Sequence, residues 1–267
     1  MTRRLDVELV HRRLAPSRGA ARADIEAGRV VVDGRPARKP SRSVSPEQRI
    51  ELVGGPARFV SRAGDKLAAA LDRFALDPGG RRCLDIGAST GGFTDCLLRR
   101  GATSVVAVDV GTDQLHPRLR TDPRVEVREQ TDVRALTTGD LVPPVDLITL
   151  DVSFISLRLV VPTVAALAGA RTPVVALVKP QFEAGRGVVA AGRGVVADPE
   201  VWAGCLHGVV EAAAGVGLQT IGLMASPIVG TAGNVEFLAH LVPGSRTLGP
   251  VEPVVRHAVA EAGTKHT

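Results

Sequence analysis

The feature that most constrains the fold is an alternation of short apolar segments with helical segments, which begins near residue 61 and continues to about residue 241. Apolar strands separated by helices indicate a parallel sheet covered on both faces, and therefore an α/β fold. Such sheets bind ligands at the carboxyl ends of their strands. The predicted strands lie at 82–86, 104–109, 124–129, 145–150, 173–178, 218–224 and 235–241, and the predicted helices at 64–75, 93–100, about 112–119, 156–169 and 199–216.

The residues before this region predict a separate small module that mixes helices and strands. The run Gly54-Gly55-Pro56 marks its boundary, because Gly and Pro interrupt regular structure. We therefore expect a first domain at 1–56, a linker at 57–60 and a second domain at 61–267. Within the first domain the expected elements are an imperfect helical stripe from Leu5 to Leu14, a helix over about 18–27 with Ser17 as its N-cap, a hairpin turn at Asp33-Gly34 and a strand at 49–53.

The positive charge of the chain is concentrated in the small module. Residues 1–55 hold 12 Lys/Arg and 7 Asp/Glu, whereas residues 56–267 hold 21 of each. A basic segment beside a neutral body favours contact with a polyanion, and nucleic acid is the best candidate. A solvated arginine-rich face without a partner is the alternative that charge alone leaves open.

Composition excludes several other classes of protein. Cys83, Cys96 and Cys205 are scattered, which argues against a disulfide framework and a thiolate zinc site. The longest charge-free apolar run has 12 residues, and a membrane span needs about 20. The first residues lack the apolar core of a signal peptide. We therefore expect a soluble cytoplasmic protein with no metal and no membrane partner.

Residues 83–98 read CLDIGASTGGFTDCLL and combine a strand, a glycine-rich turn and the start of a helix. The Walker loop and the dinucleotide motif G-x-G-x-x-G are both absent. Asp85 repels pyrophosphate but can accept hydrogen bonds from an ammonium group. This suits S-adenosylmethionine, which carries an ammonium, a carboxylate and no phosphate. Asp109 is placed for the ribose hydroxyls, and Asp132 for the adenine amino group.

A strand end with ordinary turn glycines is the alternative interpretation of this stretch. The residues predicted to contact the cofactor are Asp85, Gly87, Ala88, Ser89, Thr90, Gly91, Gly92, Asp109, Asp132 and Phe154.

Four further ionisable residues are expected at the same edge of the sheet. Asp151 and Lys179 end two strands, Lys66 lies in the helix before the first strand, and Glu236 opens the last strand, which reaches this edge if it is antiparallel. A hydroxyl is a poor nucleophile at neutral pH, and a lysine beside a second cation in a partly dry site can take its proton. We cast Lys179 as base or hydroxyl activator and Asp151 as its orienter, with Lys66 and Glu236 completing the network. Two unconnected salt bridges are the alternative.

The residues after Asp151 bear on the substrate. Methyltransferases that act on exocyclic base amines place [DN]-P-P-[FYW] at this point, whereas this chain reads Asp151-Val152-Ser153-Phe154. The two missing prolines favour a hydroxyl over a base amine. Further along, the six residues GRGVVA occur twice within 185–197. The long glycine-rich loop expected at 180–197 is either a lid or substrate clamp, which we favour, or a tolerated insertion.

In this combination the motifs resemble the TlyA family, also called haemolysin A-like, of ribosomal RNA 2′-O-methyltransferases. The resemblance covers essentially the whole chain. It is carried, in order, by RLDVELVHRRLAPSRGAARADIEAGRVVVDG, FVSRAGDKL, CLDIGASTGGFTDCLL, DVSFISL, LVKPQFE and GNVEFL.

The resemblance implies an FtsJ-like Rossmann methyltransferase domain, with a mostly parallel sheet and an antiparallel last strand, after a small α+β S4-like RNA-binding domain. It implies that the family's Lys-Asp-Lys-Glu tetrad falls on Lys66, Asp151, Lys179 and Glu236. It further implies methylation of cytidine ribose in 16S and 23S rRNA of the 30S and 50S subunits, with an effect on sensitivity to capreomycin-type antibiotics. The residues expected to meet RNA phosphates are Arg3, Arg4, Arg18, Arg38 and Lys39.

Four other functions are alternatives to this one. A non-catalytic RNA-binding or assembly factor would hold the cofactor without turnover, and an intact tetrad argues against it. A membrane-lytic protein would need a span or a strongly amphipathic cationic helix. An NAD-dependent oxidoreductase would need the missing glycine motif. An rRNA base methyltransferase would keep the enzyme class and change the target.

Overall fold

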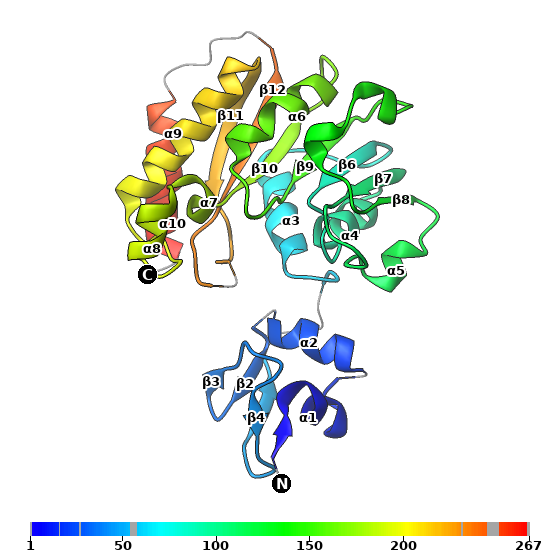
Figure 1. Ribbon diagram of the computed structural model, residues 1–267, viewed down its shortest axis with the longest axis vertical. Coiled ribbons are helices and arrows are strands. Elements are labelled where there is room, and N and C mark those ends of the chain that lie inside the picture. Colours follow the sequence, from blue (N-terminus) through cyan, green and yellow to red (C-terminus); the bar gives the residue numbers. More distant parts are fainter. Residues whose placement is uncertain are drawn as a thin grey trace. The chain divides into compact units, whose positions relative to one another are not determined.

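The computed structural model describes residues 2–15, 17–26, 28–53, 58–230, 232–244 and 251–265. The chain divides into two compact units, Met1–Arg62 and Ala63–Thr267, which are drawn in Figure 1. The predicted boundary at Gly54-Gly55-Pro56 and the first residue of the predicted linker lie outside the described residues. The domain limits 1–56 and 61–267 therefore stay a prediction.

Unit 1 consists of two short helices and small antiparallel sheets. The hairpin predicted at Asp33-Gly34 is present, because β2 and β3 flank this turn and pair with each other. The other edge of β2 pairs with β5. Ser17 accepts a hydrogen bond from the backbone N–H of Ala20, as expected of an N-cap. The elements are β1 (Arg3–Arg4), α1 (Leu5–His11), α2 (Arg18–Glu26), β2 (Val30–Val32), β3 (Arg35–Pro36), β4 (Ser43–Val44) and β5 (Ile50–Leu52).

A core of small aliphatic side chains holds unit 1 together, and two acidic residues lie beside it. Asp6 is fully buried and Glu8 nearly so. Asp6 accepts hydrogen bonds from Arg4 and Arg18, at 3.0 and 3.2 Å, and its carboxylate lies 3.4 Å from Arg22 Nε. The hydrogen bond from Arg4, with that from Arg18, lowers the pKa of Asp6 to about 2. One buried carboxylate therefore fixes three half-exposed guanidinium groups.

Unit 2 is built on a sheet with the strand order β11-β12-β10-β9-β6-β7-β8. The neighbours from β10 to β8 are parallel, and β12 runs antiparallel between β10 and β11. The predicted α/β fold with an antiparallel last strand is confirmed. The elements are α3 (Ala63–Arg73), β6 (Arg82–Ile86), α4 (Gly92–Arg99), β7 (Ser104–Val108), α5 (Pro117–Arg120), β8 (Val125–Arg128), β9 (Leu147–Leu150), α6 (Val161–Leu167), β10 (Val174–Val178), α7 (Pro180–Glu183), α8 (Arg186–Ala191), α9 (Pro199–Gly215), β11 (Leu218–Ala225), β12 (Phe237–Pro243) and α10 (Glu252–Lys265), with 3₁₀ turns at Val133–Ala135, Thr138–Asp140 and Leu157–Leu159.

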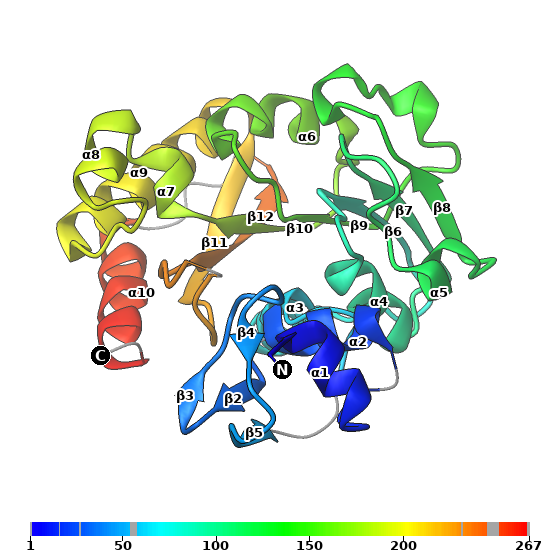
Figure 2. The ribbon, with the colours of Figure 1, turned by 60° about the horizontal axis from the view of Figure 1, so that its bottom comes forward.

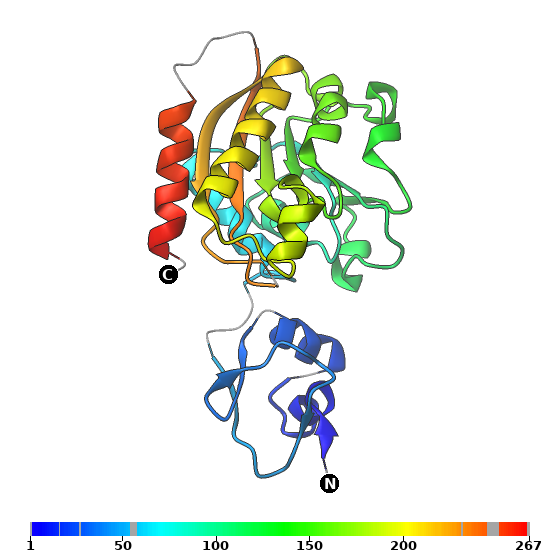
Figure 3. The same ribbon diagram turned by 60° about the vertical axis from the view of Figure 1, so that its left-hand side comes forward.

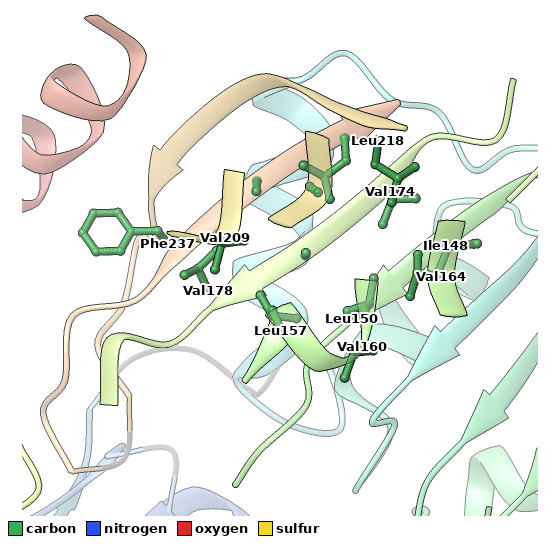
Figure 4. Close-up of a cluster of buried hydrophobic side chains, with 14 of the residues drawn as sticks. Ile148, Leu150, Leu157, Val160, Val164, Val174, Val178, Val209, Leu218 and Phe237 are labelled. Atoms are coloured by element: carbon green, nitrogen blue, oxygen red, sulfur yellow. The ribbon is translucent and has the colours of Figure 1, made fainter. Parts of the chain in front are cut away.

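Helices cover both faces of this sheet. Figure 2 shows α6 and α9 on one face and α3 and α4 on the other. Under α6 and α9 the side chains of the parallel strands form one apolar cluster, in which Val174 and Val178 of β10 lie beside Val164 and Val209 (Figure 4). Burying such a side chain is worth about 1.5–3 kcal/mol. The continuous Val and Leu runs of the sequence follow from a sheet that is buried on both faces.

The structure corrects two helix predictions and one loop prediction. The helix expected at about 112–119 is reduced to α5, because Pro117 suits the first turn of a helix and disfavours a helical conformation for His116, whose ψ is 134°. The helix expected at 156–169 is a 3₁₀ turn followed by α6, which begins with a proline in its first turn. The loop expected at 180–197 contains α7 and α8.

A last helix, α10, was not predicted. It lies beside β11 and contacts α9 (Figure 3). Its buried residues Val255, Ala258 and Ala262 follow a helical spacing and join the same apolar cluster. Glu261 of this helix accepts a hydrogen bond from the backbone N–H of Ala225, which ends β11. The helix thus covers the edge of the sheet that β11 would otherwise expose.

We expect Asp6→Asn to lower the free energy of unfolding of unit 1 by about 2 kcal/mol at neutral pH, since hydrogen bonds to a buried charged group would be lost. The wild-type contribution should vanish as the pH falls from about 4 to about 2, because the folded pKa of Asp6 lies below the unfolded value. Hydrogen exchange of α1 and α2 against pH measures both effects. Glu51→Gln, which removes an exposed ion pair with Arg49, is the matched control and should change little. Equal effects of the two substitutions would contradict the interpretation.

Candidate active site

The ionisable residues predicted at the sheet edge do come together there. Asp151 follows β9, Lys179 follows β10, and Glu236 directly precedes β12. β9 and β10 are parallel, and β12 is antiparallel to β10 with Val178 opposite Phe237. The carboxyl ends of β9 and β10 therefore meet the beginning of β12 at one edge of the sheet.

These residues form two ion pairs. Lys179 Nζ lies 2.6 Å from Asp151 Oδ1 and donates a hydrogen bond of 2.8 Å to Ser153 Oγ. Lys66 Nζ of α3 pairs with Glu236 Oε2, and both side chains are buried. Burying charges is costly, and a pair of this kind adds little net stability compared with apolar residues. Two such pairs beside one another are therefore better explained by chemistry than by folding.

A pocket of about 720 Å³ opens beside the Lys179–Asp151 pair. Both Asp151 and Ser153, the two partners of Lys179, line its wall. Five of the residues predicted to contact a cofactor line it as well, namely Gly87, Ser89, Asp109, Asp132 and Phe154. The others predicted, Asp85, Ala88, Thr90, Gly91 and Gly92, are not among its lining residues.

Three carboxylates and one arginine, Arg134, line this pocket, and two of the carboxylates lie away from Lys179. Asp109 accepts backbone hydrogen bonds from Ser89 at 2.8 Å and Gly111 at 2.7 Å, one on each oxygen, and each oxygen keeps a lone pair for a further donor. Asp132 is held by Arg134, whose hydrogen bonds lower the pKa of this carboxyl to about 2. The Asp132 carboxyl therefore stays ionised across the physiological pH range.

Gly87 brings the glycine-rich turn against the neighbouring strand. Its φ is +81°, and a Cβ built there would lie 2.7 Å from the carbonyl oxygen of Asp151. The backbone N–H of Asp151 also donates to the carbonyl of Ile86 at 2.9 Å. Only glycine fits both the left-handed conformation and this close approach. The turn residue and the paired carboxylate thus keep a fixed relation to one another.

Asp85 does not reach the pocket, in contrast to the prediction that it accepts hydrogen bonds from the cofactor. Its carboxylate is fully buried and accepts hydrogen bonds from Thr94 Oγ1 at 2.7 Å and Thr149 Oγ1 at 3.0 Å. Burial raises its pKa to about 7. Asp85 therefore ties β6 to α4 and β9 behind the turn.

Three residues that the sequence reasoning passed over support the site. Ser153 contacts Lys179. Glu183, at the end of α7, accepts hydrogen bonds from Ser156 Oγ at 2.5 Å and from the backbone N–H of Leu157 at 2.7 Å. Asn234 bridges the carbonyl of Gly194 and the N–H of Val196, each at 2.8 Å. All three lie within the quoted motifs DVSFISL, LVKPQFE and GNVEFL, but no local pattern distinguishes them.

The residues predicted to meet RNA all lie on unit 1. Arg4 and Arg18 share the buried Asp6, whereas Arg3 pairs with Glu8 at 3.1 Å. Arg38 and Lys39 are exposed. Arg22, which was not predicted, joins the Asp6 cluster.

Within the described ranges, no helix has the length and apolar character needed to cross a bilayer. The same residues contain no group of three or more His, Cys, Asp or Glu side chains arranged to hold a metal ion.

Family models match both parts of the chain. The FtsJ-like methyltransferase model matches residues 59–242, and the S4 domain model matches residues 3–50. The 16S/23S rRNA (cytidine-2'-O)-methyltransferase TlyA of Mycobacterium tuberculosis (strain ATCC 25618 / H37Rv) is 47% identical over 262 residues, covering 97% of each chain. The chain belongs to the TlyA family of FtsJ-like methyltransferases.

Two further relatives agree with membership of the TlyA family. Hemolysin A of Brachyspira hyodysenteriae is 40% identical over 243 residues, which are 90% of this chain and 99% of that one. A solved structure from Streptococcus thermophilus is 40% identical, with a TM-score of 0.79 over 99% of this chain and 96% of that chain. The family and the fold imply S-adenosylmethionine as the cofactor.

We expect Asp85→Asn to change how stability depends on pH. The folded pKa of Asp85 is raised to about 7 from 3.8, so the folded state holds the proton more tightly. The wild-type free energy of unfolding should then fall as the pH rises from about 4 to about 7, by an amount on the order of 4 kcal/mol.

Urea unfolding between pH 4 and 8 measures this dependence, which Asp85→Asn should flatten. Asp113→Asn, the same substitution at a highly exposed carboxylate, should leave the slope unchanged. An unaltered pH dependence in Asp85→Asn would show that Asp85 is ionised throughout this range.

Proposed function

We propose that this chain transfers a methyl group from S-adenosylmethionine to the 2′-oxygen of a cytidine ribose in ribosomal RNA, in the cytoplasm, with 16S and 23S rRNA as the substrates. The observation that carries the proposal is the Lys179–Asp151 pair at the wall of an acidic pocket. It is supported by the 47% identity to an enzyme named for this reaction. An effect on sensitivity to capreomycin-type antibiotics follows if this chain modifies the rRNA nucleotides on which binding of these antibiotics depends.

The pocket residues fit the proposed cofactor. Asp109 offers free lone pairs to ribose hydroxyls. Asp132 lines the same pocket, and an adenine amino group would bind it by replacing part of its contact with Arg134. The negative charge of both suits a ligand with a sulfonium and an ammonium, and the bare backbone at Gly87 permits close approach. Bound there, S-adenosylmethionine supplies an electrophilic methyl group.

Lys179 prepares the attacking oxygen. Asp151 and Ser153 hold its amino group at the pocket wall, so that one position of Nζ is favoured over the many open to a free lysine side chain. From this position the neutral amine, formed when Lys179 has released one proton to solvent, takes the proton of the 2′-hydroxyl as the oxygen attacks the methyl group. In the alternative, the ammonium donates a hydrogen bond to the oxygen and the hydroxyl proton passes to solvent. Positioning of this kind removes orientational freedom from the reacting groups and can supply a large part of the rate.

The Lys66–Glu236 pair completes the site from the other side of the sheet edge. Glu236 lies one residue beyond the Val178–Phe237 register pair, so it is the sheet neighbour of Lys179. Its carboxylate is already committed to Lys66. We assign Lys66 the role of a second fixed cation and Glu236 that of its anchor.

Unit 1 supplies the contacts that recognise RNA. The guanidinium groups around Asp6 outnumber its single negative charge, which leaves them free to bind phosphate. The described part of the chain has few aromatic residues to stack on bases, so backbone charge and shape carry this recognition.

The test is transfer of tritiated methyl groups to purified 30S and 50S subunits, followed by nucleoside digestion to separate 2′-O-methylcytidine from methylated bases. Lys179→Arg keeps the positive charge but cannot release a proton, so we expect a loss of at least about 100-fold in kcat if Lys179 acts as a base. Lys179→Ala should lose as much or more, with cofactor binding retained in both variants.

Ser153→Ala is the matched control, because it removes one partner of Lys179 and leaves the Asp151 pair intact. The loss of kcat in Ser153→Ala should be smaller than that in either Lys179 variant. Absence of methyl transfer by the wild type despite cofactor binding would favour a non-catalytic binding factor. A methylated base as the product would replace the ribose as target.

We also expect Gly230→Ala to lower kcat by about tenfold without unfolding the chain. A Cβ at Gly230 would lie 2.7 Å from Glu236 Oε1, so the carboxylate must shift relative to Lys66, and small displacements of positioned groups are costly in rate. Gly204→Ala in α9, where an added Cβ meets nothing within 4 Å, should keep full activity. Wild-type kcat in Gly230→Ala would remove Glu236 from the proposed machinery.

A further inference from the structure

A second pocket lies next to the cofactor pocket. Its volume is about 560 Å³, and it shares Phe154, Ile155 and Ser156 with the first. The remaining wall comes from α7, α8 and the turn after α8, which contain the repeated GRGVVA segment. We call it the arginine pocket, because Arg186 and Arg193 are its charged lining residues.

The two pockets have opposite charge. Asp109, Asp132 and Asp151 line the first together with a single arginine, Arg134, whereas no acidic residue is among the lining residues of the arginine pocket. Arg186 and Arg193 are exposed, and across the described ranges neither has a side-chain hydrogen bond or ion-pair partner. By contrast, Arg158 and Arg134 nearby are paired with acids. A cationic ligand is directed to the first pocket and an anionic ligand to the second.

Aromatic side chains form the border between the pockets. Phe154 is 93% exposed and has a φ of +63°, an unusual conformation for a bulky residue. Its ring centroid lies 5.3 Å from that of Phe182, which also lines the arginine pocket. The exposed ring of Phe154 and the half-buried ring of Phe182 lie in the same pocket as two guanidinium groups that have no partner among the described residues. Such a pocket suits a ligand that has both a flat base and a phosphate.

Both walls of the arginine pocket are connected to the proposed catalytic residues. α7, which carries Phe182, begins immediately after Lys179. On the opposite side Asn234 holds the turn at Gly194 and Val196 through two hydrogen bonds, and Asn234 lies two residues before Glu236. A ligand in this pocket would therefore lie beside the reacting groups without displacing the cofactor.

We propose that the arginine pocket binds the phosphate and base of a nucleotide adjoining the methylated one in the same RNA strand. This inference rests on the proposed function and extends it to the substrate strand. Arg186 and Arg193 contact the phosphate backbone, and Phe154 and Phe182 contact the base. The repeated segment thus serves as a clamp on RNA, built from a short helix and a turn.

The first experiment compares the wild type with the double variant Arg186→Gln/Arg193→Gln in binding and methylation of purified ribosomal subunits. When the logarithm of the binding constant is plotted against the logarithm of the salt concentration, the slope for the double variant should be shallower than that of the wild type by about 1.4. The reason is that two contacts to single-stranded phosphates are lost. KM for the subunits should rise at least about fivefold while kcat changes less than about twofold, as expected for lost binding outside the reacting centre. Cofactor affinity should be unchanged.

The matched control is Arg171→Gln, which removes another exposed arginine, before the amino end of β10 and so at the opposite edge of the sheet. It should leave both KM and the salt slope at their wild-type values. Unchanged KM and slope in the double variant, or equal changes in the control, would overturn the proposal.

The second experiment places the photocrosslinker p-benzoylphenylalanine at Val189, which lines the arginine pocket. Illumination of the complex with subunits should crosslink the chain to rRNA. Crosslinks to a ribosomal protein alone, or none at all, would overturn the proposal. If the wild type transfers no methyl group, the proposed function fails, and the salt slope and the crosslink still decide whether RNA occupies this pocket.

Discussion

The antiparallel pairing of β12 with β10 is the constraint on which the rest of the site depends. A parallel strand in this position would place Glu236 at the amino edge of the sheet, far from Lys179. With Val178 opposite Phe237, the residue after β10 and the residue before β12 become neighbours. The reversal thus brings an acid from late in the chain beside a lysine that ends an earlier strand, and helix α3 completes the group with Lys66.

The arrangement of charge follows from this geometry. Each buried lysine has its own carboxylate, so that two cations can lie at one edge of a sheet without repelling each other out of it. Asp109 and Asp132 of the cofactor pocket follow β7 and β8, whereas Arg186 and Arg193 of the arginine pocket lie in α8 and the turn after it. A cationic methyl donor and an anionic nucleic acid would then approach Lys179 from different sides, each attracted by the opposite charge of its own pocket.

Much of this could be predicted from sequence because the signals are local. Runs of Val, Leu and Ile predicted the strands of the large sheet. The ionisable residues at the ends of these strands predicted the ion pair between Lys179 and Asp151. What escaped prediction depends on contacts between distant residues. Thr149, which lies 64 positions after Asp85 in the chain, helps to hold the Asp85 carboxylate away from the pocket. Helix α8 forms in a segment whose glycines predicted a loop.

The cluster around Asp6 has a consequence for the thermodynamics of association. Holding a long, freely rotating arginine side chain in one conformation costs about 1.5–2 kcal/mol in rotamer entropy. In unit 1 the buried carboxylate imposes much of that order on Arg4, Arg18 and Arg22 when the chain folds. These side chains therefore have little rotamer entropy left to lose when they bind a phosphate. Association through these arginines should therefore have a smaller unfavourable entropy than association through the same number of unanchored arginines, and this difference can be measured by calorimetry.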